Sequence, residues 1–103
     1  MRFDSIYEFS IYNLLLQKGY TVLDRQPKIY LSAAKILYKP DFKCKGPSDE
    51  RIFFVEAKGF ETPIWRLKKR LWASYGVFDL HVYSKKGIEV IKPPRASNLI
   101  DGP

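Results

Sequence analysis

Apolar residues at helical spacing predict that the segment from Ser5 to Lys18 forms the first helix of the chain. Asp4 or Ser5 supplies the N-cap oxygen at its start, and Gly19 ends it. The run Leu14–Leu16 makes the segment apolar around most of its circumference. We therefore expect this helix to be buried on more than one side.

A second helix is predicted from Thr62 to about Ser74, because Thr62 suits the N-cap and Pro63 the first helical position. Its expected core face consists of three aliphatic residues at positions i, i+3 and i+7: Ile64, Leu67 and Leu71. Trp65 and Trp72 lie on one side of the helix. We expect them to pack on the sheet or on a partner chain rather than on bases.

Segments rich in Tyr, Val, Ile and Leu predict β-strands between and after the helices. They span residues 20–23, 28–31, 35–43, 51–57, 78–83 and 88–91. A turn signal at residues 45–50 joins the third of these strands to the fourth in a predicted hairpin. This order of elements predicts an α/β (α+β) fold with a mixed β-sheet flanked by helices.

The chain of 103 residues suits a single domain, which we assign to residues 1–92, followed by an irregular C-terminal tail at 93–103. The longest purely apolar run has four residues, so we expect no transmembrane or secretory segment and no membrane partner. The lone Cys44 cannot form an internal disulfide, which fits a cytoplasmic protein, and we expect it to be a small strand residue.

The candidate chemistry lies in the predicted hairpin. A turn that is symmetric about Ser48 and Asp49 pairs residues whose numbers sum to 97, so Asp41 lies opposite Glu56. Opposed residues point to one face of the sheet, and Lys58 points to that face too. Two adjacent carboxylates repel, which predicts a divalent cation, Mg²⁺ by default with Mn²⁺ as a substitute. The alternative is an edge salt bridge, worth under about 1 kcal/mol if exposed.

The runs YKPDF at residues 38–42 and FVEAKG at 54–59 resemble the signature of the PD-(D/E)XK nucleases. Over about residues 3–83 the chain resembles small phage and prophage nucleases related to the phage endonuclease I type of Holliday junction resolvase. This resemblance implies a restriction-endonuclease-like core of order α-β-β-β-α-β, here with an extra terminal strand. It also implies that Asp41 and Glu56 bind metal, that Lys58 assists catalysis, and that the protein acts in a host cytoplasm.

Glu8 has two interpretations. In the first, Ser5-x-x-Glu8 is a capping box, and the glutamate satisfies the helix N-terminus. In the second, Glu8 points to the protein interior, where a carboxylate needs a cation or a strong hydrogen bond. It shares a helix face with three residues: Ile11, Tyr12 and Leu15. The resemblance implies that Glu8 completes the metal site.

A net charge of +7 and a pI near 9.6 favour polyanionic partners, nucleic acid first. The residues expected to bind DNA are a basic stripe on the second helix and lysines near Asp41: Arg66, Lys69, Arg70, Lys39 and Lys43. The single histidine, His81, alternates with apolar neighbours in a predicted strand. We interpret it as structural.

The leading hypothesis is a metal-dependent DNA endonuclease, structure-selective on branched DNA and active as a homodimer. The dimer rests on the resemblance and on the apolar first helix. The alternatives are a nicking or degradative phage nuclease, a nucleic-acid-binding module without catalysis, and an interaction protein whose first helix docks a larger complex.

Overall fold

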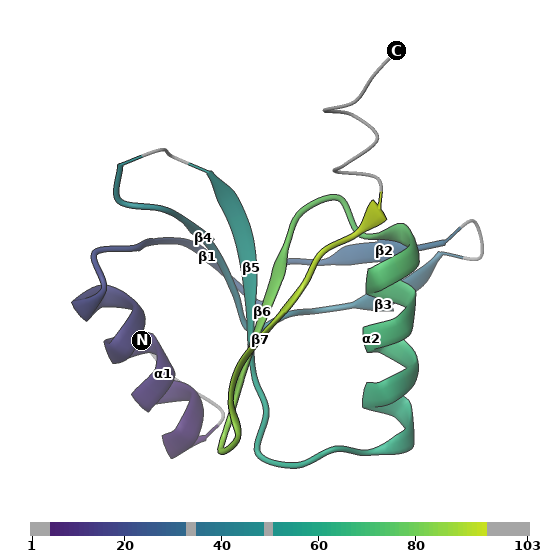
Figure 1. Ribbon diagram of the computed structural model, residues 1–103, viewed down its shortest axis with the longest axis horizontal. Coiled ribbons are helices and arrows are strands. Elements are labelled where there is room, and N and C mark those ends of the chain that lie inside the picture. The colour runs from purple at the N-terminus through teal and green to yellow at the C-terminus, as the bar shows by residue number, and fades with distance from the viewer. Residues whose placement is uncertain (1–4, 33–34, 49–50, 95–103) are drawn as a thin grey trace.

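The computed structural model describes residues 5–32, 35–48 and 51–94 and has a mixed α+β fold (Figure 1). A five-stranded sheet has the order β1-β4-β5-β6-β7, and a separate two-stranded ribbon pairs β2 with β3. The elements are α1 (Ile6–Gln17), β1 (Thr21–Arg25), β2 (Ile29–Leu31), β3 (Ile36–Tyr38), β4 (Phe42–Lys45), β5 (Ile52–Ala57), α2 (Pro63–Tyr75), β6 (Leu80–Ser84) and β7 (Gly87–Ile91).

The β4–β5 hairpin has the predicted register. Its antiparallel partners run from Phe42↔Val55 to Lys45↔Ile52, and every pair of residue numbers sums to 97. β5 then pairs in parallel with β6, which requires a crossover connection, and α2 is that connection. The hairpin therefore lies in the middle of the sheet, with β1 beyond β4 and β6 beyond β5.

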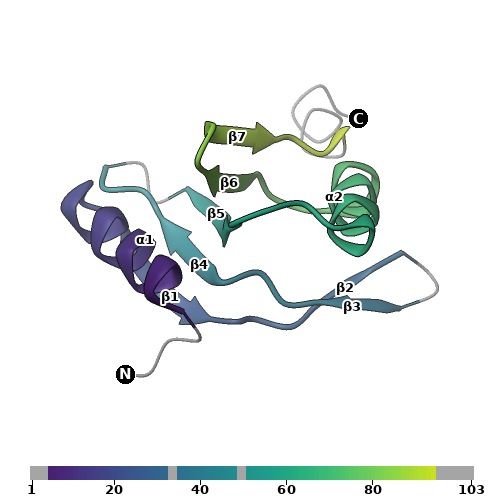
Figure 2. The same ribbon diagram turned by 90° about the horizontal axis from the view of Figure 1, so that it is seen from below.

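The two helices cover opposite faces of the sheet (Figure 2). On the α1 side, Ile11 and Leu15 pack in one core cluster with Val55. On the α2 side, Trp72 packs in a second cluster with Phe54. Successive residues of β5 thus face different cores, because side chains alternate across a strand. Phe54 and Glu56 consequently share the α2 face.

The prediction of one strand over residues 35–43 is wrong. The chain forms β3 and then β4, in different sheets, with residues 39–41 between them. Pro40 lies in this break and has no N–H for a β-ladder hydrogen bond. The β2–β3 ribbon extends past the sheet edge beside α2 (Figure 2). Asp41 therefore lies immediately before β4, next to a change of direction in the chain.

Both helices begin at the predicted caps, because the Ser5 and Thr62 side chains accept backbone N–H groups. The buried faces of the helices differ from the prediction, which expected α1 to be buried on more than one side. Only one side of α1 is buried. Several apolar residues on its other sides are exposed: Ile6, Phe9, Leu14 and Leu16. In α2 the core face is formed by Trp65 and Trp72, as expected for the tryptophans. Of the three aliphatic residues expected there, Leu71 packs against the core, whereas Ile64 and Leu67 are exposed.

Neither of the two described helices is long and apolar enough to cross a membrane. Of the predicted C-terminal tail, residues 95–103 lie outside the described residues.

Adjacent leucines in α1 provide a test of this packing. Leu15 is fully buried, whereas Leu16 is 46% exposed. We expect Leu15→Ala to lower the free energy of unfolding by about 2–5 kcal/mol, because it leaves a cavity between α1 and the sheet. Leu16→Ala is the matched control and should cost less than about 1 kcal/mol. Urea unfolding measures both, and equal losses would contradict the observed orientation of α1.

Candidate functional site

Asp41 is held against the end of β5. Its carboxylate oxygen Oδ2 accepts the backbone N–H of Ala57 at 2.7 Å. Its backbone carbonyl accepts the N–H of Gln26 at 2.9 Å, which ties it to the segment after β1. β5 and the segment after β1 thus hold Asp41 in place.

Glu56 lies on β5 and is buried. The Tyr38 hydroxyl donates a hydrogen bond to Glu56 Oε1 at 2.5 Å. Burial raises the pKa of Tyr38 far above its ordinary value, and the charge of Glu56 raises it further. The hydroxyl therefore stays protonated, which allows it to donate this hydrogen bond. The tyrosine ring is fixed in turn, because it contacts the rings of Trp65 and Trp72.

Lys58 follows β5 and completes the group. Its Nζ lies 4.0 Å from Glu56 Oε2 and 4.9 Å from the centre of the Trp65 ring. The indole face attracts the ammonium. The charge of Lys58 is therefore held beside the carboxylate by contacts on two sides.

The pKa of Glu56 is unusually high for a carboxyl group. Burial and the neighbouring Asp41 raise the pKa of Glu56 from its ordinary 4.5 to about 8, against the lowering effects of Tyr38 and Lys58. A side-chain hydrogen bond with Asp41 also raises this pKa. A proton or a cation bound between the two carboxyl groups would relieve their repulsion.

A cavity of about 410 Å³ opens beside this group. It is lined in part by Tyr38, Lys39, Glu56, Lys58, Trp65 and Lys68. Lys68 was not among the residues predicted from the sequence. Its Nζ lies 5.8 Å from the centre of the Tyr38 ring. No local pattern indicated this position, because it depends on the contact of Lys68 with Tyr38 on β3, which is distant in the sequence.

Glu8 is buried on α1, and its Oε1 lies 3.5 Å from Arg25 Nη2. Its backbone N–H donates to Ser5 Oγ, so the capping contact forms as well. Over the described ranges 5–32, 35–48 and 51–94, no set of three or more Asp, Glu, His or Cys side chains is placed to hold a metal ion. The structure therefore brings Asp41 and Glu56 together but does not gather Glu8 with them.

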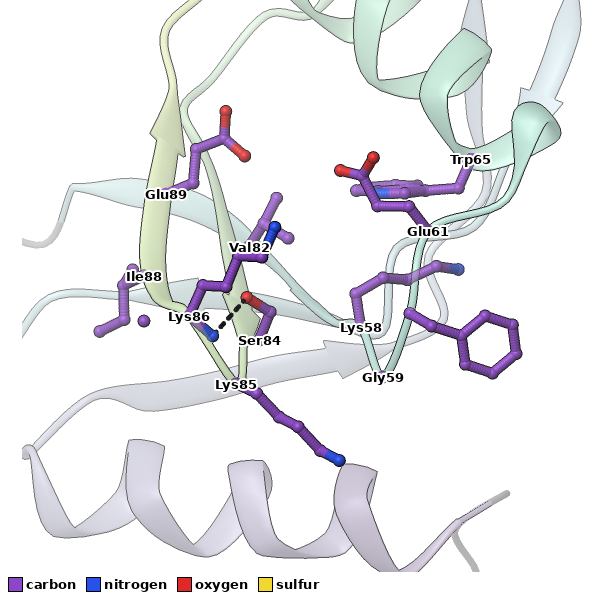
Figure 3. A pocket seen from close by; sticks show the side chains of 12 residues that line it. Lys58, Gly59, Glu61, Trp65, Val82, Ser84, Lys85, Lys86, Ile88 and Glu89 are labelled. Atoms are coloured by element: carbon purple, nitrogen blue, oxygen red, sulfur yellow. Dashed lines mark hydrogen bonds between the residues drawn. The ribbon is translucent and has the colours of Figure 1, made fainter.

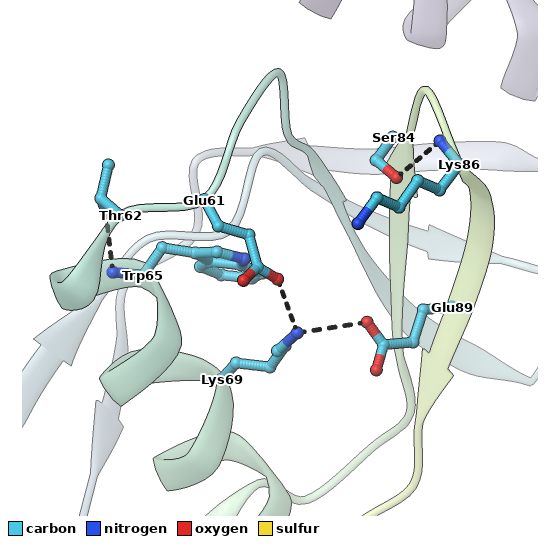
Figure 4. A network of polar contacts seen from close by, with 7 residues as sticks. All are labelled: Glu61, Thr62, Trp65, Lys69, Ser84, Lys86 and Glu89. Carbon is cyan, nitrogen blue, oxygen red and sulfur yellow. Dashed lines mark hydrogen bonds and ion pairs between the residues drawn. The ribbon is translucent and has the colours of Figure 1, made fainter.

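The predicted DNA-binding residues are scattered. Arg66 and Arg70 are exposed on α2, and Lys39 lines the cavity beside Glu56. Lys43 is half-buried on β4. Lys69 forms a bridge between elements, with Nζ 3.0 Å from Glu61 Oε1 and 3.3 Å from Glu89 Oε1 (Figure 4). The charge of Lys69 is therefore neutralised locally.

His81 and Cys44 pack against neighbouring side chains, as the sequence indicated. His81 is stacked on Phe53 with the ring centres 4.4 Å apart, and burial lowers its pKa. Cys44 is fully buried in the α1-side core, and burial raises its pKa to about 12.

The donor set of Asp41 and Glu56 fits Mg²⁺ or Mn²⁺. Magnesium is commonly bound by one or two carboxylates and keeps several waters, so two protein ligands are sufficient. A cation would relieve the repulsion that raises the pKa of Glu56. Comparison with models of known protein families gives no match, and no curated protein sequence matches the chain.

The raised pKa of Glu56 predicts how stability depends on pH. Between pH 4.5 and about 8 the folded chain keeps a proton that the unfolded chain releases, so the free energy of unfolding falls as pH rises through this window. Urea unfolding in chelator from pH 4 to 9 measures this. In Glu56→Gln the fall should be smaller, and an identical pH dependence in the two proteins would contradict the assignment.

Proposed function

We propose that this protein is a Mg²⁺-dependent DNA endonuclease that hydrolyses phosphodiester bonds. The observation that supports this most is the convergence of Asp41, Glu56 and Lys58 at one end of the β4–β5 hairpin. The raised pKa of Glu56 adds to it, because perturbed carboxylates cluster at functional sites.

Each side chain has a distinct role in this proposal. Asp41 and Glu56 would hold the cation, which supplies a Lewis acid beside the phosphodiester. Tyr38 orients Glu56 through its hydrogen bond, as outer partners of metal ligands do. Lys58 places a positive charge next to Glu56, where it can position the attacking water or take part in its deprotonation.

The approach of DNA is supported by the lysines around the cavity. A polyanion must come close to two carboxylates, so positive charge is needed at the rim. Lys39 and Lys68 line the same cavity as Glu56. The net charge of +7 gives a general attraction that falls as salt rises.

The finer features of this proposal derive from the resemblance described above. They are a restriction-endonuclease-like core, a preference for branched DNA such as a four-way junction, and action as a homodimer with two active centres. Two observations are compatible with them. β5 and β6 pair in parallel across the α2 crossover, and α1 exposes an apolar side. A second copy of the chain would cover that side.

Replacing Asp41 tests the chemistry. We expect Asp41→Asn to lower the rate of cleavage of labelled four-way junctions in Mg²⁺ by more than about 100-fold, because several kcal/mol of charge stabilisation are lost. DNA binding in chelator should persist. Asp24→Asn is the matched control, since Asp24 is an exposed carboxylate on β1. If the wild type binds four-way junctions but does not cleave them in Mg²⁺ or Mn²⁺, the result would instead support a nucleic-acid-binding module without catalysis.

Removing the Tyr38 hydroxyl tests the orientation of Glu56. We expect Tyr38→Phe to weaken Mn²⁺ binding by about 10–100-fold, as changes to the outer partners of metal ligands do. Tyr30→Phe is the control, because Tyr30 is 61% exposed on β2. Calorimetric titration of each protein without DNA gives the affinities. Equal affinities in wild type and Tyr38→Phe would remove Tyr38 from the site.

A further inference from the structure

A second cavity adjoins the candidate active centre. It has a volume of about 490 Å³ and opens between the end of β5, the start of α2 and the β6–β7 hairpin (Figure 3). Lys58 and Trp65 line both this cavity and the one beside Glu56. A strand whose phosphate lies at Lys58 would therefore place a neighbouring nucleotide at the mouth of the second cavity.

Two carboxylates line it. Glu61 and Glu89 point toward one another across the cavity (Figure 3). The ammonium of Lys69 lies between them and contacts both (Figure 4). Lys69 donates to one oxygen of each glutamate, and an ionised carboxylate offers about four acceptor positions on its two oxygens. Lys69, together with the charges of Arg66 and Lys86, lowers the pKa of Glu61, which keeps it ionised. The cavity thus presents fixed hydrogen-bond acceptors.

The remaining lining suits a planar ring with a phosphate at its edge. Trp65, Val82 and Ile88 provide apolar surface. Lys58 and Lys86 supply positive charge, while Lys85 points away from the cavity (Figure 3). Sites for small molecules commonly measure about 300–1,000 Å³ and combine apolar walls with a few fixed polar groups. This cavity has both properties.

We propose that this cavity binds an unpaired nucleobase of the DNA strand, next to the phosphate that lies at Lys58. Glu61 and Glu89 accept hydrogen bonds from the N–H donors of the exocyclic amino group of the base, and Lys86 contacts a flanking phosphate. The proposal rests on the proposed function, because it is the placement of the cut phosphate that puts the base here.

The acceptors predict which bases are preferred. Cytosine carries an N4 amino group with two donors for glutamate oxygens. Thymine has no amino group, and its single N3–H donor lies between two carbonyl oxygens, which a carboxylate repels. Wild-type protein in chelator should therefore bind the single-stranded hexamer dC6 about tenfold more tightly than dT6. Fluorescence anisotropy of labelled hexamers measures this difference without any cleavage.

The decisive variant is the double substitution Glu61→Gln with Glu89→Gln. Both side chains are about half exposed, so loss of their surface ion pairs should leave the fold intact. The preference for dC6 over dT6 should fall to less than about twofold, because each amide also offers a donor to thymine. The control Asp24→Asn removes a carboxylate from β1 and should keep the wild-type ratio.

Equal affinity of the wild type for dC6 and dT6 would overturn the proposal, as would an unchanged ratio in the double variant. Free dCMP should compete only weakly with dC6. Competition at equal concentration would overturn the assignment to a base within a strand. The outcomes separate the two proposals: a base preference without cleavage of any DNA refutes the nuclease, whereas cleavage without a base preference refutes this cavity assignment.

Discussion

The antiparallel pairing of β4 with β5 is the constraint on which the candidate site depends. Its register carries Asp41 to the end of β5, where the backbone N–H of Ala57 fixes the carboxylate. A shift of one residue would turn Glu56 to the α1 face, away from Asp41 and Tyr38. The register is secured by burial, because Val55 and Phe54 fill different cores on the two sides of the sheet.

The α2-side core also shapes the site. Trp65 contacts Tyr38, and Tyr38 in turn orients Glu56. The ammonium of Lys58 lies over the Trp65 ring. The same indole lines both cavities. Packing and chemistry are therefore coupled: the aromatic residues that hold α2 on the sheet also determine where the charges lie. Burial by this core and the neighbouring Asp41 raise the pKa of Glu56, and such a carboxylate favours a cation.

Local signals in the sequence were sufficient for the helix caps and for the hairpin register, since both depend on residues that are close along the chain. The break at Pro40 was missed, because the apolar run on either side of it suggested one continuous strand. Of the aliphatic residues assigned to the inward face of α2, Leu71 packs against the core, but Ile64 and Leu67 are exposed. The buried residues of that face are Trp65 and Trp72, whose large rings cover it. The partner of Glu8 is Arg25, on another element, and no local pattern indicates that contact.

Calorimetric titration of the metal-free protein with Mn²⁺ at pH 7, in two buffers of different ionisation enthalpy, tests the paired-carboxylate site most directly. Because the pKa of Glu56 lies at about 8, a cation that binds there must displace a proton. The account predicts saturable binding with release of about one proton per cation, and loss of that release in Glu56→Gln. Saturable binding without proton release, or no saturable binding, would contradict it.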